Sequence, residues 1–241
     1  MNILIITGGS KGIGKAIAQN YLSNNYSVFS ISRSKARKVN YYQVEANLVS
    51  SIEAIKAIKA IFSKFDLTTI TSITLINNAG SLGEINSIGN LESENIEQTI
   101  QLNTVTPIVL SNEFIKLTNR LKCKKQIITI SSGAAINPYA GWSVYCSSKA
   151  AIEMMTKTIA QEQNELAYGV KAVAIKPGVV DTNMQTQIRN TSEKAFKNVR
   201  RFKALKDNNE LYTPEFVSSK IYAIDSGNLL KNGDIIDIRT F

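Results

Sequence analysis

The chain has 241 residues, of which 44% are hydrophobic and 20% charged, a composition that suits one α/β domain built on a single extended sheet. No window holds the ~18 apolar residues that a membrane helix needs, so we expect no membrane partner. The net charge of +9 is spread along the chain with short basic clusters at residues 32–38 and 189–203, and no nucleic-acid-binding motif accompanies it. This pattern favours a solvated basic surface, or a small anionic ligand, over nucleic acid.

Metal binding and secretion are not indicated. The chain has no histidine, and its two cysteines, Cys123 and Cys146, are not spaced as metal ligands. The first residues, MNILIITGGS, lack a basic leader and a small-residue cleavage site and are typical of a first strand. We therefore expect a cytoplasmic protein without a metal.

Apolar, β-rich runs alternate along the chain with segments of helical periodicity. The runs are NILIIT, YSVFSIS, SITLINN, QIITIS, VKAVAIKP and DIIDI, and the expected helices are 11–24, 51–65, 92–102, 105–118 and 144–165. This alternation predicts a single domain over residues 1–241, a Rossmann fold with a doubly wound parallel sheet of about seven strands and helices on both faces. Residues 184–211 are polar, basic and aperiodic, so we expect an irregular, lid-like segment there.

A glycine loop follows the first strand in the stretch IITGGSKGIGKAIA. Glycine permits a tight turn and lets the backbone approach a pyrophosphate, whose charge the helix N-terminus stabilises. The spacing differs from G-x-G-x-x-G, so a glycine-rich turn without a ligand is the alternative. The cofactor-binding candidates here are Gly8, Ser10, Lys11, Gly12, Ile13 and Gly14.

The end of the second strand indicates which dinucleotide is bound. Many dinucleotide folds place an acidic residue there for the ribose hydroxyls, but this chain has Ser32 and Arg33, with Lys11 nearby. Two cations without a carboxylate favour a ribose 2′-phosphate, and hence NADPH over NADH. The alternative is that both are ordinary surface cations.

A serine, a tyrosine and a lysine form the candidate reacting group. Tyr145 and Lys149 lie four positions apart and share one face of the predicted helix. We expect the ammonium to lower the tyrosine pKa from its ordinary value near ~10, which makes a general acid. Ser132 ends the strand QIITIS, at the sheet edge where open α/β folds bind ligands. Packing of an apolar ring beside a lysine stem is the alternative for the pair.

Taken together, these motifs resemble the short-chain dehydrogenase/reductase family over the whole chain. TGGSKGIG matches the cofactor loop, NNAG at 77–80 matches the motif after the fourth strand, and PGVVDT at 177–182 matches the loop beside the nicotinamide. Asn47 is a departure, because the family usually has an aspartate there. The resemblance implies the catalytic residues Asn103, Ser132, Tyr145 and Lys149. It implies further cofactor contacts from Asn47, Leu48, Asn78, Ala79, Gly80, Tyr145, Lys149, Pro177, Gly178, Val180 and Thr182.

The resemblance also implies a reaction, the NADP(H)-dependent reduction of a small-molecule carbonyl. In that reaction Ser132 orients the carbonyl oxygen and Tyr145 supplies the proton. Lys149 holds the nicotinamide ribose and lowers the tyrosine pKa, and Asn103 helps to position a water that relays protons to Lys149.

Two stretches, NPYAGWSVYCSSKA and PGVVDTNMQTQIR, are similar to the sepiapterin reductase branch, which includes bacterial benzil reductases. The expected substrate is therefore a vicinal diketone or a pterin side-chain ketone. Tyr139 and Trp142 are candidate aromatic walls or ordinary packing residues, Cys146 is structural, and Asp237 matches a pterin-anchoring aspartate or is a solvated charge. The candidate substrate contacts are Ser132, Trp142, Tyr145, Met184 and Asp237.

Two other functions stay open at this point. A 3-oxoacyl-carrier-protein reductase shares all these motifs and would dock an acidic carrier on the basic surface. A non-catalytic NADP-binding redox sensor is the second, although the presence of Tyr145 and Lys149 disfavours it. The resemblance further implies a homodimer or homotetramer, because small residues at 147, 148, 150 and 151 allow close approach of another helix.

Overall fold

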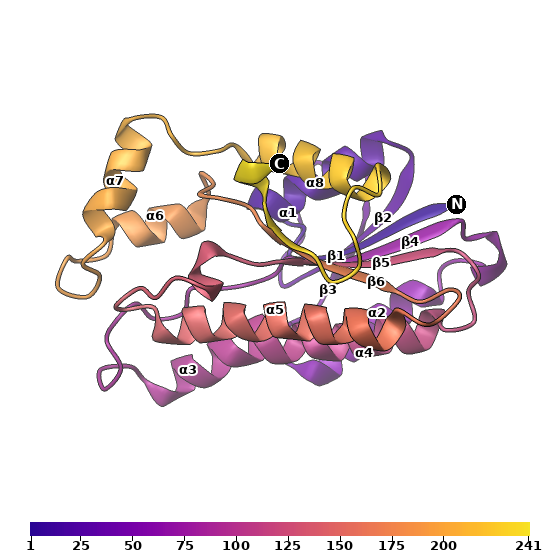
Figure 1. Ribbon diagram of the computed structural model, residues 1–241, viewed down its shortest axis with the longest axis horizontal. Helices are drawn as coiled ribbons and strands as arrows, with labels where there is room; N and C mark the ends of the chain where they lie inside the picture. Colours follow the sequence, from indigo (N-terminus) through magenta and orange to yellow (C-terminus); the bar gives the residue numbers. More distant parts are fainter.

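The computed structural model describes residues 1–241 and has one sheet of seven parallel strands (Figure 1). The strand order is β3-β2-β1-β4-β5-β6-β7, so the winding direction reverses between β1 and β4. The prediction of a doubly wound parallel sheet of about seven strands is confirmed. The strands are β1 (Asn2–Thr7), β2 (Tyr26–Ser32), β3 (Tyr42–Glu45), β4 (Ser72–Asn77), β5 (Lys124–Ile130), β6 (Lys171–Lys176) and β7 (Ile235–Asp237).

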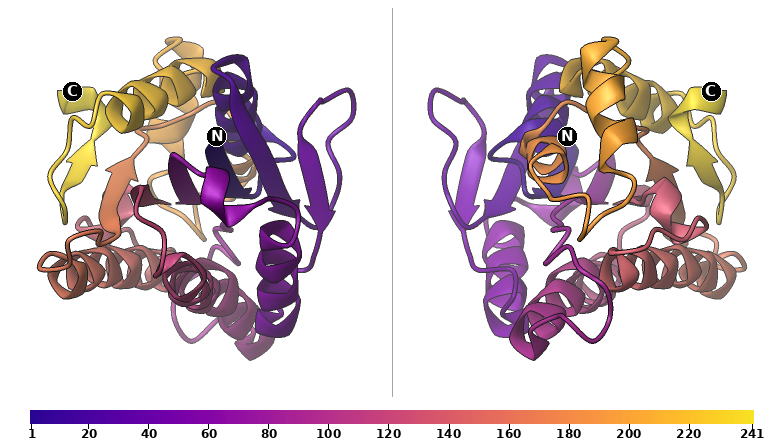
Figure 2. Two further views of the ribbon diagram at one scale, coloured as in Figure 1. Left: turned by 90° about the vertical axis from the view of Figure 1, so that its right-hand side faces the viewer. Right: turned by 90° about the vertical axis from the view of Figure 1, so that its left-hand side faces the viewer.

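Helices cover both faces of the sheet (Figures 1 and 2). On one face α1 (Gly12–Ser23) packs against α8 (Pro214–Ser226), and on the other lie α2 (Ser51–Phe62), α4 (Thr106–Thr118) and α5 (Ser143–Gln163). Helix α3 (Ser93–Ile100) continues into α4 through a π-helical turn, Gln101–Val105. Short 3₁₀ turns occupy Leu67–Thr69, Gly133–Ala135 and Ile238–Thr240. No helix is both long enough and apolar enough to span a bilayer.

The apolar run of β1 shows why the sheet needs helices on both sides. Successive side chains of a strand point to opposite faces. Ile3 and Ile5 accordingly belong to the core under α2 and α4, whereas Leu4 and Ile6 belong to the core under α1 and α8. A continuous apolar run is therefore the mark of a strand that is buried on both faces.

Strand β3 and helix α8 were not among the elements expected from the sequence. Strand β3 has the sequence YQVE, pairs only with β2 at the sheet edge and has no fully buried residue, so it carries no hydrophobic pattern. Helix α8 did carry a readable start signal. The Thr213 hydroxyl accepts a hydrogen bond from the Phe216 N–H at 3.1 Å, and Pro214 occupies the first helical position.

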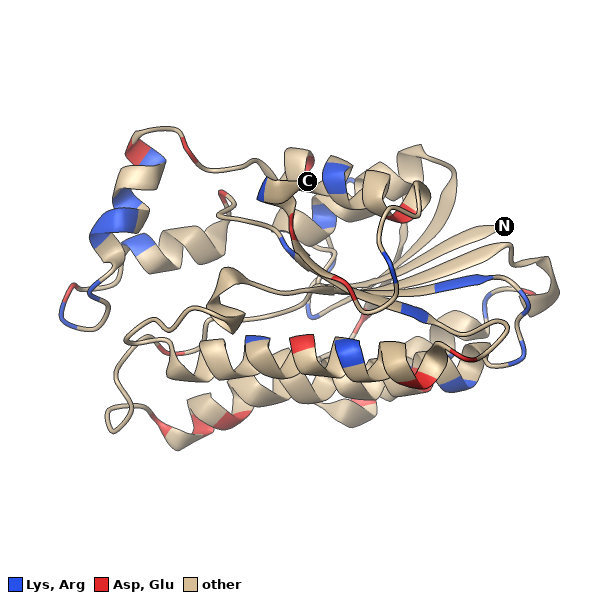
Figure 3. Cartoon of the chain, viewed as in Figure 1, with Lys and Arg blue, Asp and Glu red and all other residues tan.

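The prediction of an irregular segment over residues 184–211 is wrong. The segment contains α6 (Asn183–Arg189) and α7 (Val199–Asp207), which lie beyond the carboxyl ends of the strands (Figures 1 and 2). In α7, Val199 and Phe202 are buried and the remaining face carries the basic residues that Figure 3 shows in blue. The apolar face of α7 is short and lies among lysines and arginines, which hid its helical period in the sequence.

Candidate active site

Two neighbouring cavities lie at the carboxyl edge of the sheet, next to the point where the strand order reverses. The larger has a volume of about 510 Å³ and extends over the glycine loop, and the smaller has a volume of about 300 Å³ and extends under α6 and α7. Open α/β sheets bind their ligands at this position. Six residues line both cavities: Ile13, Ser131, Tyr145, Pro177, Thr182 and Met184.

The glycine loop is shaped for an anion. Gly8 and Gly12 have φ of +72° and +53°, which side chains rarely adopt, and a Cβ at Gly14 would overlap the Gly8 carbonyl. The first turn of α1 has no side-chain cap and no acidic residue, so its N–H groups stay available. An uncapped helix N-terminus behind a glycine cradle fits the pyrophosphate of a dinucleotide.

Hydrogen bonds to β4 hold this loop in place. The Thr7 hydroxyl accepts hydrogen bonds from the N–H groups of Asn78 and Ala79, both at 3.0 Å. The Asn78 amide nitrogen donates to the Thr7 carbonyl at 2.9 Å, so this side chain supports the loop. Asn78, Ala79 and Gly80, which the motif predicts as cofactor contacts, all line the larger cavity.

Asn47 and Leu48, the two predicted cofactor contacts before α2, also line the larger cavity. The side-chain amide oxygen of Asn47 accepts a hydrogen bond from the Val49 N–H at 3.2 Å, which closes a local turn. Leu48 is buried beside it and lines the cavity with no such bond. The Asn47 amide oxygen therefore helps to fix the shape of the loop.

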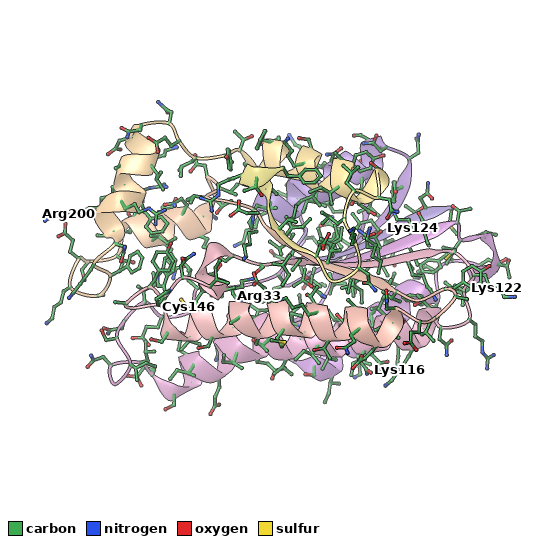
Figure 4. All side chains as sticks on the ribbon, viewed as in Figure 1. Arg33, Lys116, Lys122, Lys124, Cys146 and Arg200 are labelled. Atoms are coloured by element: carbon green, nitrogen blue, oxygen red, sulfur yellow. The ribbon has the colours of Figure 1, made fainter.

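The rim of the larger cavity near β2 is cationic. Lys11 and Arg33 line it, are exposed and have no ion-pair partner, while the Ser32 hydroxyl donates to the Ser34 carbonyl at 2.8 Å. Figure 4 shows Arg33 near the middle of the molecule. Because Lys11 and Arg33 both line the larger cavity, both lie at the ligand-binding edge of the sheet.

The predicted reacting residues come together between the two cavities. Tyr145 and Lys149 project from α5 and are each only 6% exposed, with the Lys149 Nζ 5.7 Å from the centre of the Tyr145 ring. The Lys149 Nζ donates a hydrogen bond to the Ile130 carbonyl at 2.9 Å. Ser132 follows β5 and lines the smaller cavity, and its hydroxyl accepts from the Ala134 N–H at 3.2 Å.

The titration of this pair differs from the expectation. Burial raises the pKa of Tyr145 to about 12, opposed by the Ser132 hydroxyl, and burial lowers the pKa of Lys149 to about 8, opposed by the Glu153 carboxylate. The prediction of a lowered tyrosine pKa is wrong for this arrangement, because the net effect of burial is to raise it. Burial disfavours the charged form of both groups, and the ammonium is bound to a carbonyl 19 residues away in the chain.

Asn103 lies in the π-helical turn and is 1% exposed. Its amide nitrogen donates to the Ser81 carbonyl at 2.7 Å and to the Ser148 hydroxyl at 3.1 Å, and its amide oxygen accepts from the Ser81 N–H at 2.9 Å. Its side chain therefore ties the loop after β4 to α5, the helix of Tyr145 and Lys149. Such π-helical turns occur frequently at functional sites.

The smaller cavity has an aromatic wall. Trp142 stacks on Phe196 with ring centres 4.5 Å apart, and the ring of Tyr139 lies 5.0 Å from Trp142. Both predicted rings line the cavity, and both also pack in the cluster under α6 and α7. Sequence reasoning missed the contributions of Phe202 and Arg201 from α7; the aromatic residues within the basic stretch 189–203 were the available signal.

The chain segments after β6 and β7 complete the smaller cavity. Gly178 and Val180, predicted as cofactor contacts, line this cavity and not the larger one. Both carboxylate oxygens of Asp237 are engaged by Arg239, with distances of 2.8 Å from Nε and 2.5 Å from Nη2. Hydrogen bonds from Arg239, together with the charge of Lys176, hold the pKa of Asp237 below its ordinary value. Arg239 was not predicted as a site residue.

A parallel sheet wound in this order, with a glycine loop after its first strand and cavities at the switch point, defines a dinucleotide-binding protein. The chain belongs to the short chain dehydrogenase family, whose model matches residues 2–193. It is 38% identical over 247 aligned residues to benzil reductase ((S)-benzoin forming) of Bacillus cereus, and the alignment covers 99% of each chain.

Two more distant similarities accompany this match. Sepiapterin reductase of Xenopus laevis is 26% identical over 60% of this chain and 53% of its own. The crystal structure of the KRED1-Pglu enzyme matches with a TM-score of 0.84 and 26% identity, over 98% of this chain and 100% of that one. The predicted resemblance to the sepiapterin and benzil reductase branch is confirmed, with the fuller match on the benzil reductase side.

Proposed function

We propose that this oxidoreductase reduces one carbonyl of a vicinal diketone at the expense of a nicotinamide cofactor. The observation that carries the proposal is the position of Tyr145, which lines both the glycine-loop cavity and the aromatic cavity. A cavity of about 300 Å³ walled by Trp142 and Tyr139 suits a flat aromatic substrate. Full-length similarity to a benzil reductase supports a diketone over a pterin.

Ser132, Tyr145 and Lys149, which lie where the two cavities meet, each take one role in the reaction. When bound, the reduced nicotinamide supplies a hydride. The Ser132 hydroxyl holds the carbonyl oxygen, and Tyr145 donates a proton to that oxygen. Because its pKa is about 12, the tyrosine hydroxyl keeps its proton at neutral pH and is ready to donate. Lys149, whose pKa is about 8, carries the positive charge that favours transfer of this proton below that pH.

Asn103 takes a positioning role in this scheme. Its hydrogen bond to Ser148 fixes α5 one residue before Lys149, and its two bonds with Ser81 anchor that end to the loop after β4. The three bonds occupy its amide, so we assign it to placing the catalytic helix.

The finer proposal for the cofactor is NADP(H). Lys11 and Arg33 border the larger cavity without ion-pair partners, and the residue that ends β2, Ser32, is not acidic. A ribose 2′-phosphate gains charge-assisted hydrogen bonds from such cations, whereas the ribose hydroxyls of NAD(H) lack the carboxylate that usually holds them.

The experiment that tests the proposal follows NADPH and NADH oxidation by the purified chain with benzil, sepiapterin, diacetyl and an acetoacetyl thioester. We expect the highest kcat/KM with benzil and NADPH, and a single benzoin enantiomer by chiral chromatography. Faster turnover of the thioester would transfer the function to 3-oxoacyl reduction. Absence of turnover with all four substrates would reject a carbonyl reductase of this class.

We further propose self-association through α4 and α5. Ile108 and Met154 project from these helices as exposed apolar side chains. Light scattering of the purified chain, with Met154→Lys as the variant, checks this: a dimer or tetramer that the lysine dissociates supports it, and a monomeric native chain contradicts it.

A further inference from the structure

A buried ionic cluster lies directly behind the proposed catalytic residues. Glu153 of α5 accepts a hydrogen bond from the Ser131 hydroxyl at 2.7 Å and pairs with the Lys176 ammonium at 3.3 Å. The exposed fractions of Ser131, Glu153 and Lys176 are 2%, 8% and 9%. The two opposite charges, Glu153 and Lys176, line neither cavity, whereas Ser131 lines both.

Each partner of Glu153 ends a strand that leads into the site. Ser131 follows β5 and immediately precedes Ser132. Lys176 is the last residue of β6 and immediately precedes the loop at Pro177 that lines both cavities. One carboxylate therefore joins the carboxyl ends of β5 and β6 to α5.

Glu153 also lies one helical turn after Lys149, on the same face of α5. The Lys149 ammonium is bound to the carbonyl of Ile130, the residue next to Ser131 in the chain. The ammonium and the carboxylate thus bind adjacent residues at the same strand end, Ile130 and Ser131.

Stability alone does not explain this arrangement. Removing two ions from water is costly in free energy, and well-packed apolar residues often replace a buried ion pair without loss of stability. A buried pair is better explained by geometry or charge that the site requires. Here every contact of the carboxylate leads to a residue adjacent to the proposed catalytic or cofactor loops.

We propose that Glu153 is a positioning residue for the reduction, which fixes the end of β5 against α5 and holds the positive charge on Lys149. The proposal rests on the proposed function, since it concerns the same site. Glu153 acts through Lys149 and Ser131 and touches neither substrate nor cofactor.

The charged groups around Glu153 alternate in sign across four elements. Lys149 faces it from α5 and Lys176 from β6, and Lys176 in turn pairs in register with Asp237 of β7, which binds Arg239. The Glu153 charge raises the pKa of Lys149 against the effect of burial. Loss of that charge therefore lets Lys149 lose its proton at a lower pH.

The test compares pH profiles of kcat/KM for benzil reduction in two variants. Glu153→Gln keeps an oxygen that accepts from Ser131 but removes the charge, so the alkaline limb should move to lower pH by about one unit. Lys176→Met removes the cation that pairs with Glu153. The Glu153 charge then acts on Lys149 alone, so the alkaline limb should move to higher pH. A purely structural role would lower the rate at every pH and leave the limb in place.

A second readout does not need turnover. The NADPH Kd is measured by fluorescence over the same pH range. As the pH rises, NADPH binding should begin to weaken at a lower pH in Glu153→Gln than in the native chain. Glu162→Gln, an exposed glutamate of the same helix, is the matched control and should leave both profiles unchanged. Glu153→Asp, which retains the charge, should keep the native limb with a reduced rate.

The outcomes separate this proposal from the proposed function. An unmoved alkaline limb and an unmoved Kd profile in Glu153→Gln would overturn it, whatever the loss of rate, and so would equal shifts in the two variants. If Glu153→Gln does not fold cooperatively, an upward shift in Lys176→Met supports the proposal and any other result overturns it. A native chain inactive with benzil rejects the diketone substrate, while the Kd profiles still decide the role of Glu153.

Discussion

The two cavities are built in different ways, although they meet at Tyr145. The larger one is framed by backbone: glycines with positive φ, the uncapped end of α1 and the strand ends of β1, β2 and β4. The smaller one is framed by side chains from α5, α6 and α7 and from the chain after β6 and β7. A backbone cavity accepts a ligand of fixed shape, whereas a side-chain cavity is changed by single substitutions. Single side-chain substitutions in the smaller cavity should therefore change which substrate is bound and leave cofactor binding in the larger cavity unchanged.

The largest expected effect follows from removing the hydroxyl of Tyr145, the residue at which the two cavities meet. Tyr145→Phe should lower kcat for benzil by at least ~100-fold, because a positioned general acid contributes 10²–10⁴-fold. The NADPH Kd should stay within about twofold, since the lost hydroxyl acts on the carbonyl oxygen. Steady-state kinetics and fluorescence titration measure the two quantities. A variant that keeps more than about a tenth of the activity, a loss below ~1.4 kcal/mol, would remove the acid role from Tyr145.

The next effect is confined to the backbone cavity. An alanine at Gly14 would overlap the Gly8 carbonyl and the Asn78 amide, so the loop must shift. We expect Gly14→Ala to weaken NADPH binding at least tenfold and to lower the free energy of unfolding by about 1–3 kcal/mol. Calorimetry and urea titration check this. Gly133→Ala, which has space for a Cβ in the other cavity, should bind NADPH normally; equal losses in both variants would contradict the division between the cavities.

A smaller effect sharpens the cofactor side. The double variant Lys11→Ala/Arg33→Ala should erase a preference of at least roughly tenfold for NADPH over NADH, chiefly by weakening NADPH. The matched control is Lys35→Ala/Arg37→Ala, two exposed cations of the same basic cluster that do not line the cavity. If the preference survives in the first double variant, or falls equally in the control, the 2′-phosphate is bound elsewhere.

Most of the predicted cofactor contacts line the backbone cavity, for a physical reason. A side chain at Gly8 would be strained by its positive φ, and one at Gly14 would overlap the Gly8 carbonyl. The continuous apolar run of β1 is typical of a strand covered on both faces. Tyr145 and Lys149 were found together because helical spacing alone places them on one face. Constraints that act within a few neighbouring residues leave a local record in the sequence.

The substrate side left no such record. Phe202 and Arg201 reach the cavity only because α7 folds back over it. The pKa of Tyr145 was predicted in the wrong direction because the i,i+4 spacing shows a neighbouring charge but not the burial of both groups. Burial and long-range contacts depend on the tertiary fold, so pattern alone could not provide them.

The smallest expected effect concerns Asp237, which lines the smaller cavity but is paired with Arg239. Its two oxygens already accept the parallel hydrogen bonds of Arg239 that a pterin edge would need to supply. Asp237→Ala should therefore change the KM for benzil and for sepiapterin by similar factors, within about threefold. It should also free the Arg239 guanidinium towards the cavity and so lower the KM for a keto acid such as phenylglyoxylate. Asp234→Ala, outside the cavity, is the control for a general effect of the chain end. A sharp rise in the sepiapterin KM alone would mean that Asp237 leaves Arg239 to bind the substrate, and the side-chain cavity would then rearrange on binding in a way that the glycine-lined cavity cannot.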